Sequence, residues 1–371
     1  MTAGLFSPIA LGPLELANRI MVSPMCQYSA LDGKPADWHL IHLGTLAVSA
    51  AGLLCMEATA VLPEGRITPA CLGLYGDEHQ AALQRLVDGI RSVSAIPLAI
   101  QLSHAGRKAS SRPPWQRGTL IAPGDGGWTP MAPSALPQRP GEPAPGSMTL
   151  AGIREVIAAF AQAARRARAI GFDAIELHMA HGYLMHQFMS PVANRRDDAY
   201  GGSFENRIRL PLQVFDAVAE AAGGRVPVGV RLSATDWVEG GWDIAQTVDL
   251  AKQLEARGCA FLDISSGGVS HQQTIPLAAG YQVPFARQVK REVGIPVVTV
   301  GLITQPAHAQ QIVAAGDADM VALARGFLHD PRWPWRAAAE LGGTVAAPNQ
   351  LLRALPAGHA PIFGDVSIGQ R

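Results

Sequence analysis

The chain has 371 residues, in which 30 Lys and Arg balance 30 Asp and Glu. Hydrophobic residues make up 48% and charged residues 16%, which excludes a disordered protein and is typical of a compact cytosolic enzyme. No basic excess points to nucleic acid or an anionic membrane, and no apolar run is long enough to span a bilayer, so small molecules are the expected partners.

Apolar runs alternate with amphipathic stretches along most of the chain. Residues 5–17 predict a hairpin with its turn at Gly12-Pro13. Short apolar runs then predict eight strands, over residues 19–23, 52–58, 97–102, 172–177, 226–232, 260–264, 295–300 and 318–323. Helical periodicity predicts the segments between them as helices, over residues 37–51, 79–94, 150–169, 204–222, 243–257, 284–293 and 305–315. Asp37 and Thr149 are predicted N-caps.

Eight strand and helix units in series predict an α/β fold, a single (β/α)8 TIM barrel that forms one domain over residues 1–371. An open doubly wound sheet is the alternative, but neither of its nucleotide-binding glycine motifs follows a strand. The segment of about 103–148 is rich in Pro, Gly and Trp, and we expect an excursion or lid beside the site. The C-terminal tail covers about 342–371.

The cysteines and the N-terminus favour a reduced, cytoplasmic location. The four cysteines show neither a C-x-x-C pair nor the spacing of zinc ligands; they are Cys26, Cys55, Cys71 and Cys259. The first residues lack the basic lead of a signal peptide.

Three polar rings follow the predicted fourth strand. On a continuing strand His178 and His181 would point to opposite faces, because side chains alternate. A turn at Gly182 would bring both imidazoles and Tyr183 to one spot. Such a group can bind a metal, orient a carbonyl substrate, or consist of side chains that only satisfy one another.

In a barrel of this kind the active site lies at the C-terminal ends of the strands. These ends carry an amide, a guanidinium, a thiol, a phenol and two imidazoles, but no carboxylate cluster beyond Glu57 and Glu176. A metal site usually includes a carboxylate or a third histidine, so this set disfavours a metal. A Schiff-base aldolase would require a lysine at a strand end, and of the lysines only Lys108 lies even near a strand mouth.

The last two predicted strands suggest a phosphate site. Gly301 permits close backbone approach and Arg325 offers a bidentate partner, at the place where barrels commonly hold a phosphate. Gln101 and Arg231 on intervening strands can bind a planar ring with carbonyl and N–H groups. A phosphorylated flavin fits this pattern.

Several motifs recur in order at separate strand ends. They are Ser23-Pro24-Met25-Cys26-Gln27-Tyr28, residues 57–61 with 64–68, residues 101–108, His178-x-x-His181-Gly182-Tyr183, residues 194–203, and Asn206-Arg207. Through them, residues 5 to about 335 resemble the Old Yellow Enzyme family of FMN-dependent ene-reductases and NADPH dehydrogenases. The resemblance is strongest to the bacterial xenobiotic-reductase branch, which has a cysteine in the first motif.

The resemblance implies a tightly bound FMN, with NADPH or NADH as the reductant and no metal. The residues implied to bind the cofactor are Ser23, Pro24, Met25, Cys26, Ala58, Gln101, Arg231, Gly301, Ala324 and Arg325. Of these, Gln101 would face the pyrimidine ring and Arg231 the N1 side, while the last three would hold the phosphate. Cys26 would lie near N5 and tune the reduction potential.

The resemblance also implies a ping-pong reduction of the C=C bond of α,β-unsaturated carbonyl or nitro compounds. Tyr28 would line the substrate pocket, and His178 and His181 would bind the substrate oxygen. Hydride transfer from flavin N5 builds negative charge on that oxygen, so two imidazole donors would stabilise the transition state more than the ground state. Tyr183 would supply the proton, because a phenol with a pKa of about 10 stays protonated at neutral pH.

Each of these residues also has a structural interpretation. Cys26 can be a small buried hydrophobe, and the remaining candidates can be ion-pair partners, strand crosslinks or packed aromatics; these are Arg231, Arg325, Gln101, Tyr28 and Tyr183. His104 and His186 are interpreted as structural. Two other functions stay open. One is a metal-dependent hydrolase or lyase that uses His178, His181 and Glu176, and the other is a barrel that binds a flavin or phosphate ligand without catalysis.

The C-terminus departs from the family pattern. Enzymes of this branch often place an aromatic residue or arginine from the C-terminus into a neighbouring active site, but residues 359–371 match no such motif. A homodimer or homotetramer is the family expectation. No ribose-reading motif favours NADPH over NADH.

Overall fold

The computed structural model of the protein describes residues 4–355 and 361–364. Its central feature is a closed barrel of parallel strands in the order β10-β11-β12-β3-β4-β5-β8-β9. The strands are β3 (Ile20–Val22), β4 (Leu53–Ala60), β5 (Leu98–Ser103), β8 (Ala174–Met179), β9 (Val228–Ser233), β10 (Leu262–Ser265), β11 (Val297–Thr299) and β12 (Met320–Leu323). The predicted TIM barrel is confirmed, and pairing of β12 with β3 excludes the open sheet.

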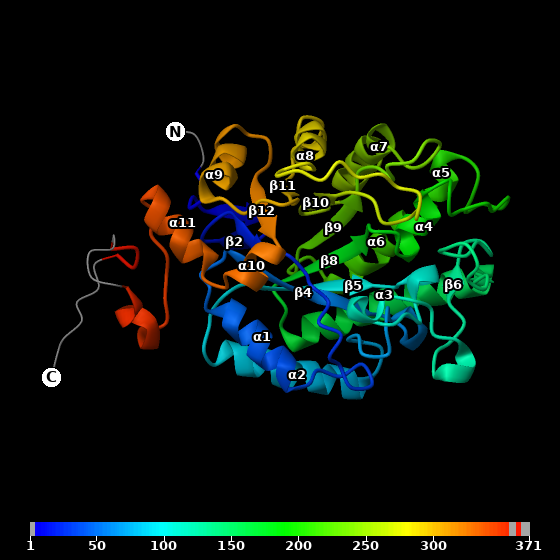
Figure 1. Ribbon diagram of the computed structural model, residues 1–371, viewed down its shortest axis with the longest axis horizontal. Helices are drawn as coiled ribbons and strands as arrows, with labels where there is room; N and C mark the ends of the chain where they lie inside the picture. The colour runs from blue at the N-terminus through cyan, green and yellow to red at the C-terminus, as the bar shows by residue number, and fades with distance from the viewer. Residues whose placement is uncertain (1–3, 356–360, 365–371) are drawn as a thin grey trace.

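Helices surround the barrel (Figure 1). They are α1 (Asp37–Ala47), α2 (Asp77–Arg91), α3 (Leu150–Ile170), α4 (Leu184–Met189), α5 (Phe204–Arg207), α6 (Arg209–Ala222), α7 (Ile244–Ala256), α8 (Val283–Lys290), α9 (Pro306–Ala314), α10 (Arg325–His329) and α11 (Trp333–Leu341). The helix predicted over 204–222 is in fact two helices, which meet at Ile208. The apolar faces of the surrounding helices pack on outward strand residues such as Ile100 and Leu177. Burial of each such side chain contributes about 1.5–3 kcal/mol to the stability of the fold.

One of the two predicted N-caps is confirmed. The Thr149 hydroxyl accepts a hydrogen bond of 3.1 Å from the Gly152 N–H at the start of α3. The prediction for Asp37 is wrong, because the N-cap of α1 is Ala36 and Asp37 is the first helical residue. The His39 ring accepts the Ala36 N–H at 3.0 Å, and Asp37 instead places a negative charge in the first turn, where the helix dipole favours it.

The inside of the barrel is apolar toward its N-terminal end. Phe261, Val298 and other inward side chains form one buried cluster there. The predicted hairpin, β1 (Ile9–Leu11) and β2 (Leu14–Leu16), adds Leu11 and Leu16 to this cluster and so closes that end. We call this cluster the apolar plug. Gly229 makes room for its Phe261, since a Cβ on Gly229 would lie 2.3 Å from the Phe261 ring. Polar inward residues therefore gather at the other end.

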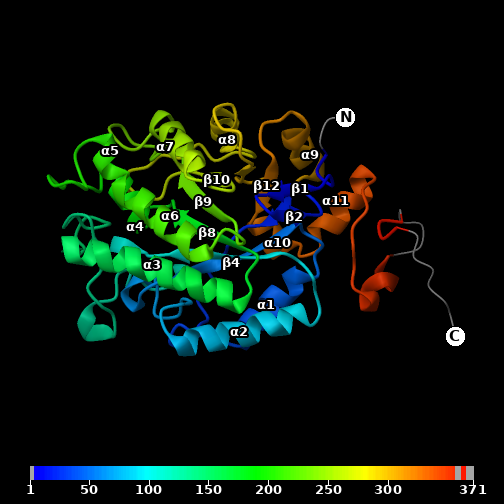
Figure 2. The same ribbon diagram turned by 180° about the vertical axis from the view of Figure 1, so that it is seen from behind.

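The predicted excursion leaves the barrel after β5. It contains three short 3-10 helices and a small sheet of β6 (Met131–Ala132) and β7 (Gly146–Ser147). Both ribbon views place it at the edge of the molecule opposite α11 (Figures 1 and 2). Arg107 ties it to the barrel, because its Nε donates to Gln138 Oε1 at 2.9 Å and its Nη2 to the Val269 carbonyl at 2.7 Å.

Part of the C-terminal segment returns to α11. The Val345 N–H donates to the Ile362 carbonyl at 2.8 Å, and the rings of Trp335 and Phe363 meet edge to face at 4.8 Å. The rest of the tail compared above, residues 359–360 and 365–371, lies outside the described residues. No helix in the described part of the chain is both long and apolar enough to cross a membrane.

Candidate active site

The backbone turns sharply after β8. His181 and Gly182 both have positive φ angles, of 58° and 72°. A Cβ on Gly182 would lie 2.1 Å from the Gly268 carbonyl oxygen, so only glycine fits this crossing of two loops. The His181 N–H donates to Ser233 Oγ at 2.9 Å, which holds a non-glycine residue in the left-handed conformation.

This turn places the three polar rings side by side. The His178 ring centroid lies 5.1 Å from that of His181 and 4.7 Å from that of Tyr183, both edge to face. His178 belongs to β8, which runs two residues beyond its predicted end, and Tyr183 directly precedes α4. The convergence predicted for these side chains is therefore present.

The hydrogen bonds of the two imidazoles assign their tautomers. The Ala180 N–H donates to His178 Nδ1 at 3.3 Å, so His178 carries its proton on Nε2, which lies 3.3 Å from His181 Nδ1. His181 Nε2 lies 2.6 Å from Ser265 Oγ. Burial and the positive charge of Arg231 lower the pKa of both imidazoles well below its usual value. Both rings are thus neutral at pH 7, with one N–H each.

Lys108, at the start of the excursion, connects the loops after β8 and β10. Its ammonium donates to the carbonyls of His181 at 2.8 Å and Gly268 at 3.1 Å, and it lies 5.2 Å from the Tyr183 ring centroid. Burial, followed by repulsion from Arg107 and Arg139, lowers the pKa of Lys108 to about 8. Burial raises the pKa of Tyr183 well above 10, so its phenol is protonated at neutral pH.

A layer of buried polar groups lies in the barrel mouth below the imidazoles. Gln101 Nε2 donates to Glu176 Oε1 at 2.6 Å. Arg231 Nε lies 3.0 Å from Asp263 Oδ2, an ion-pair distance without hydrogen-bond geometry. Burial raises the pKa of Glu176 and of Asp263, although the Arg231 charge opposes this shift. Two acids therefore share one guanidinium.

The prediction that the strand ends hold no carboxylate cluster beyond Glu57 and Glu176 is wrong. Asp263 is paired in register with Arg231 on β9, and its side chain is fully buried beside Glu176. Glu57 is elsewhere, because its carboxylate accepts the Gln27 N–H at 3.1 Å and lies 3.4 Å from His39 Nε2. Asp263 stands between Leu262 and Ile264 inside the predicted strand 260–264, so a search of residues at strand ends did not include this carboxylate.

Loops after β3 and β4 border the same mouth. The Ser23 N–H continues the β3 pairing by donating to the Leu323 carbonyl at 3.0 Å, and residues 24–28 follow. Burial, and then the nearby Cys71 and Glu57, raise the pKa of the Cys26 thiol well above its usual value, so Cys26 is a neutral thiol. Ala58 lies on β4, opposite Gln101 in the register of β4 with β5.

A cavity of about 160 Å³ opens beside the mouth at the ends of β11 and β12. Its lining includes Gly301, Ala324 and Arg325, the residues predicted to hold a phosphate. Gly301 has a φ of 129°, and a Cβ there would lie 3.0 Å from Gln282 Nε2. Ser265 contacts His181 and also lines this cavity, so the cavity and the imidazole pair are adjacent.

Sequence reasoning missed Gln282. Its buried amide accepts a hydrogen bond of 2.6 Å from Ser266 Oγ and donates to the Val300 carbonyl at 3.1 Å, which links the ends of β10 and β11. It is the N-cap residue of α8, so a search confined to strand ends could not find it.

A larger cleft of about 350 Å³ lies over the rings. Tyr28 and Tyr183 both line it, and the Tyr28 ring packs edge to face on Trp115 of the excursion at 5.6 Å. The other lining residues come mainly from the excursion and the β10 loop. The excursion thus forms one wall of the cleft.

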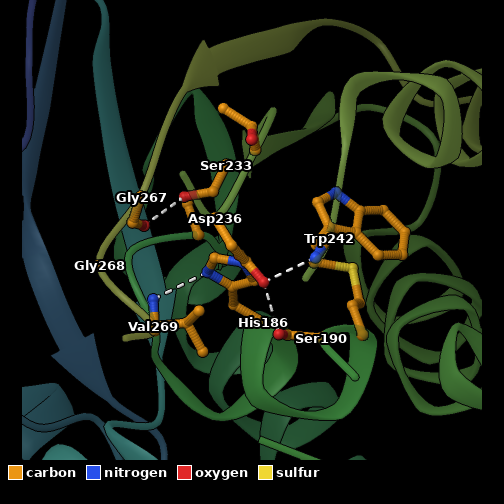
Figure 3. Close-up of polar contacts among 12 residues, drawn as sticks. His186, Ser190, Ser233, Asp236, Trp242, Gly267, Gly268 and Val269 are labelled. Atoms are coloured by element: carbon orange, nitrogen blue, oxygen red, sulfur yellow. Dashed lines mark hydrogen bonds and ion pairs between the residues drawn. The ribbon is translucent and has the colours of Figure 1, made fainter. Parts of the chain in front are cut away.

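A buried polar network supports the β8 loop from below. Figure 3 shows His186 of α4 and Ser190, the C-cap residue of this helix, facing Asp236 and Trp242, which follow β9. The Gly182 N–H donates to His186 Nδ1 at 2.9 Å, so the ring donates from Nε2 to Asp236 Oδ1 at 2.7 Å. Asp236 Oδ2 accepts from Ser190 Oγ at 2.6 Å and from the Trp242 N–H at 2.7 Å. His186, interpreted as structural, therefore holds the turn after β8 in place.

The candidate metal ligands do not form a metal site. Among the residues that the structure describes, no group of three His, Cys, Asp or Glu side chains is arranged to hold a metal ion. His178, His181 and Glu176, the set named for a hydrolase or lyase, are therefore not such a group.

Comparisons with known proteins agree with this arrangement. The model of a family described as NADH:flavin oxidoreductase / NADH oxidase matches residues 4–342. An NADPH dehydrogenase of Geobacillus sp. is 44% identical over 355 residues, which cover 95% of this chain and 99% of that protein.

Two solved structures are also similar. A morphinone reductase in complex with tetrahydroNAD is 31% identical with a TM-score of 0.75, over 94% of this chain and 93% of that chain. An old yellow enzyme homologue from Zymomonas mobilis is 26% identical with a TM-score of 0.76, over 93% and 94% of the two chains.

The Asp236 network predicts a pH-dependent stability. Burial acts to raise the pKa of Asp236, but His186 and the other hydrogen-bond donors outweigh it and the pKa is lowered. We expect Asp236→Asn to lower the free energy of unfolding by about 3 kcal/mol at pH 7, because an amide N–H would meet buried donors. Since the native pKa is depressed, this difference should shrink as pH falls below about 4. Urea denaturation at pH 7 and pH 3 measures it.

The matched control is Asp216→Asn, which breaks the half-exposed pair of Asp216 with Arg257. We expect this variant to lose less than about 1 kcal/mol. Equal losses in the two variants would contradict the supporting role of Asp236.

Proposed function

The chain belongs to the NADH:flavin oxidoreductase / NADH oxidase family, and we propose that this oxidoreductase reduces the activated C=C bond of α,β-unsaturated carbonyl or nitro compounds. The reductant is NADPH or NADH, and FMN is the cofactor. One observation carries the proposal. Two neutral imidazoles and a protonated phenol meet at the mouth of a barrel that also presents Gln101 and Arg231.

The residues of the mouth fit FMN. Among the described residues, buried Arg231 Nε and Glu176 Oε2 have no hydrogen-bond partner, and Gln101 donates to Glu176 from its amide nitrogen, which leaves its carbonyl to accept. These groups match a ring with alternating donors and acceptors. Arg231 and Gln101 would therefore hold the isoalloxazine.

The neighbouring groups fit the rest of the cofactor. The cavity beside the mouth offers the Gly301 backbone and the Arg325 guanidinium, which suit a phosphate. Ala324 would add its backbone to this site. Backbone groups just after β3 and on β4 would border the ring; they belong to Ser23, Pro24, Met25 and Ala58.

FMN, when bound, supplies the hydride that passes from the nicotinamide to the β-carbon of the alkene. His178 presents its Nε2–H toward His181 and would instead donate it to the substrate oxygen. The N–H of His181 faces Ser265 Oγ, so binding the same oxygen requires His181 to release this contact. One such donor contributes about 3 kcal/mol to an oxyanion-like transition state.

Tyr183 is the proton donor in this proposal. Its pKa, raised by burial, keeps the proton on the phenol at neutral pH, whereas the two imidazoles carry no extra proton to give. Tyr28 lines the same cleft and would contact the alkene substrate.

A visible spectrum tests the proposed function. We expect purified protein incubated with FMN to retain a flavin spectrum, to bleach when NADPH is added without oxygen, and to regain colour with cyclohexenone. A colourless protein that binds no FMN would refute the proposal. Bound flavin that neither NADPH nor NADH can reduce would instead favour a binding protein without catalysis.

Tyr183→Phe should separate the two half-reactions. Only alkene reduction needs the proton, so we expect it to slow about 100-fold or more while flavin reduction by NADPH keeps its rate. Stopped-flow absorbance measures each half-reaction. Tyr200→Phe, which removes a phenol hydrogen-bonded to Gln213, should change neither rate. Equal slowing of both half-reactions by Tyr183→Phe would contradict the assigned role.

Cys26→Ala tests the proposed tuning of the flavin. We expect the variant to retain FMN with a shifted reduction potential, because a polarisable thiol beside the ring would be lost. Redox titration monitored by absorbance measures the potential. Cys259→Ala is the control, because it removes a buried thiol that contacts the Phe261 carbonyl at the apolar end of the barrel. This variant should leave the reduction potential unchanged. An unshifted potential in Cys26→Ala would make this residue a packing element.

A further inference from the structure

The cleft over the rings has an uneven charge. Its lining includes the cationic side chains of Arg107, Lys108, Arg112 and Arg139, but only one carboxylate, that of Glu142. The whole chain has a formal net charge of zero. The positive character is thus a local property of this cleft, and it attracts anionic groups there.

Two of the four cations are already engaged. Arg107 donates to Gln138 and to the carbonyls of the excursion and the β10 loop. Lys108 donates to the carbonyls of His181 and Gly268. Both side chains hold loops together through their N–H groups. Their positive charges therefore add to the electrostatic potential of the cleft, but these N–H groups already have acceptors.

The other two cations are available. Arg112 and Arg139 are exposed at the outer part of the cleft, and neither makes an ion pair among the described residues. Arg139 Nη1 has one weak contact, 3.5 Å from the Arg117 carbonyl. Glu142 Oε2 accepts the backbone N–H of Arg139 at 3.2 Å, which fixes the loop that carries this arginine.

We propose that Arg112 and Arg139 bind phosphate groups of the nicotinamide dinucleotide reductant, an inference that rests on the proposed function. The inner part of the same cleft is lined by Tyr28 and Tyr183, where the nicotinamide must come to deliver hydride. The remainder of a dinucleotide then extends outward past the two guanidinium groups. A neutral enone has no group for them, whereas phosphates match their planar donor geometry.

The test compares hydride donors on the double variant Arg112→Gln/Arg139→Gln. Anaerobic stopped-flow reduction of the FMN-loaded protein is measured with NADPH, NADH and 1-benzyl-1,4-dihydronicotinamide, which carries no phosphate. We expect the Kd for NADPH to rise about 10- to 100-fold. The rate at saturating NADPH, the reaction with the benzyl donor and reoxidation by cyclohexenone should not change.

The NADPH and NADH arms distinguish the phosphates. A rise in Kd for NADPH alone assigns the arginines to the 2′-phosphate, and a similar rise for both assigns them to the pyrophosphate. Arg112→Lys/Arg139→Lys should recover part of the affinity. Glu142→Gln should act in the opposite direction and lower the Kd for NADPH, because it removes the carboxylate from the cleft.

Arg85→Gln is the matched control, since it removes one exposed arginine from the outer helix α2. It should leave the Kd for NADPH unchanged. An unchanged Kd for NADPH in the double variant would overturn the inference, as would an equal loss with the benzyl donor. Wild-type protein in which even the benzyl donor cannot reduce bound FMN would refute the proposed function itself.

Discussion

The candidate site depends on the close contact of two loops through glycine backbone. Gly182 after β8 and Gly268 after β10 approach so closely that a Cβ on either would lie within 2.5 Å of the other loop. Lys108 then donates to a carbonyl on each side, from His181 and from Gly268. The excursion that starts beside Lys108 is therefore anchored to the same crossing. This contact sets the direction of the His181 and Tyr183 side chains.

Burial has opposite effects on the pKa values of the imidazoles and of the phenol. Because the low-dielectric mouth and the Arg231 charge both lower the pKa of His178 and His181, the imidazoles can donate a hydrogen bond but hold no spare proton. The same burial raises the pKa of Tyr183, which favours the protonated phenol. In the proposed reaction, charge stabilisation thus falls to the histidines and proton delivery to the tyrosine.

The sequence was sufficient for the barrel because its strands are buried on both faces and so appear as short apolar runs. It also placed Gln101, His178 and Arg231 on barrel strands, where the structure has them on β5, β8 and β9. It failed where a side chain reaches the site from another element. Gln282 stands at the N-cap position of α8, and Asp236 contacts the site through His186 from a loop, so neither follows the strand-end pattern. Helix boundaries also failed locally, as at Ile208, because Pro211 in the first turn of α6 cannot donate a hydrogen bond to the Arg207 carbonyl and so interrupts a continuous periodic pattern.

Asp263 balances a buried charge in the barrel mouth. Arg231 alone in the mouth would be an uncompensated buried cation, which is costly, and Glu176 makes no ion pair with it among the described residues, since its Oε1 accepts from Gln101 and its Oε2 has no partner. A second acid is therefore needed, and Asp263 supplies it at 3.0 Å. Burial raises the pKa of both acids, and the Arg231 charge opposes this shift, so the three buried groups depend on one another. In the proposed function, Arg231 would keep its Nε for the flavin ring, because this atom has no hydrogen-bond partner among the described residues.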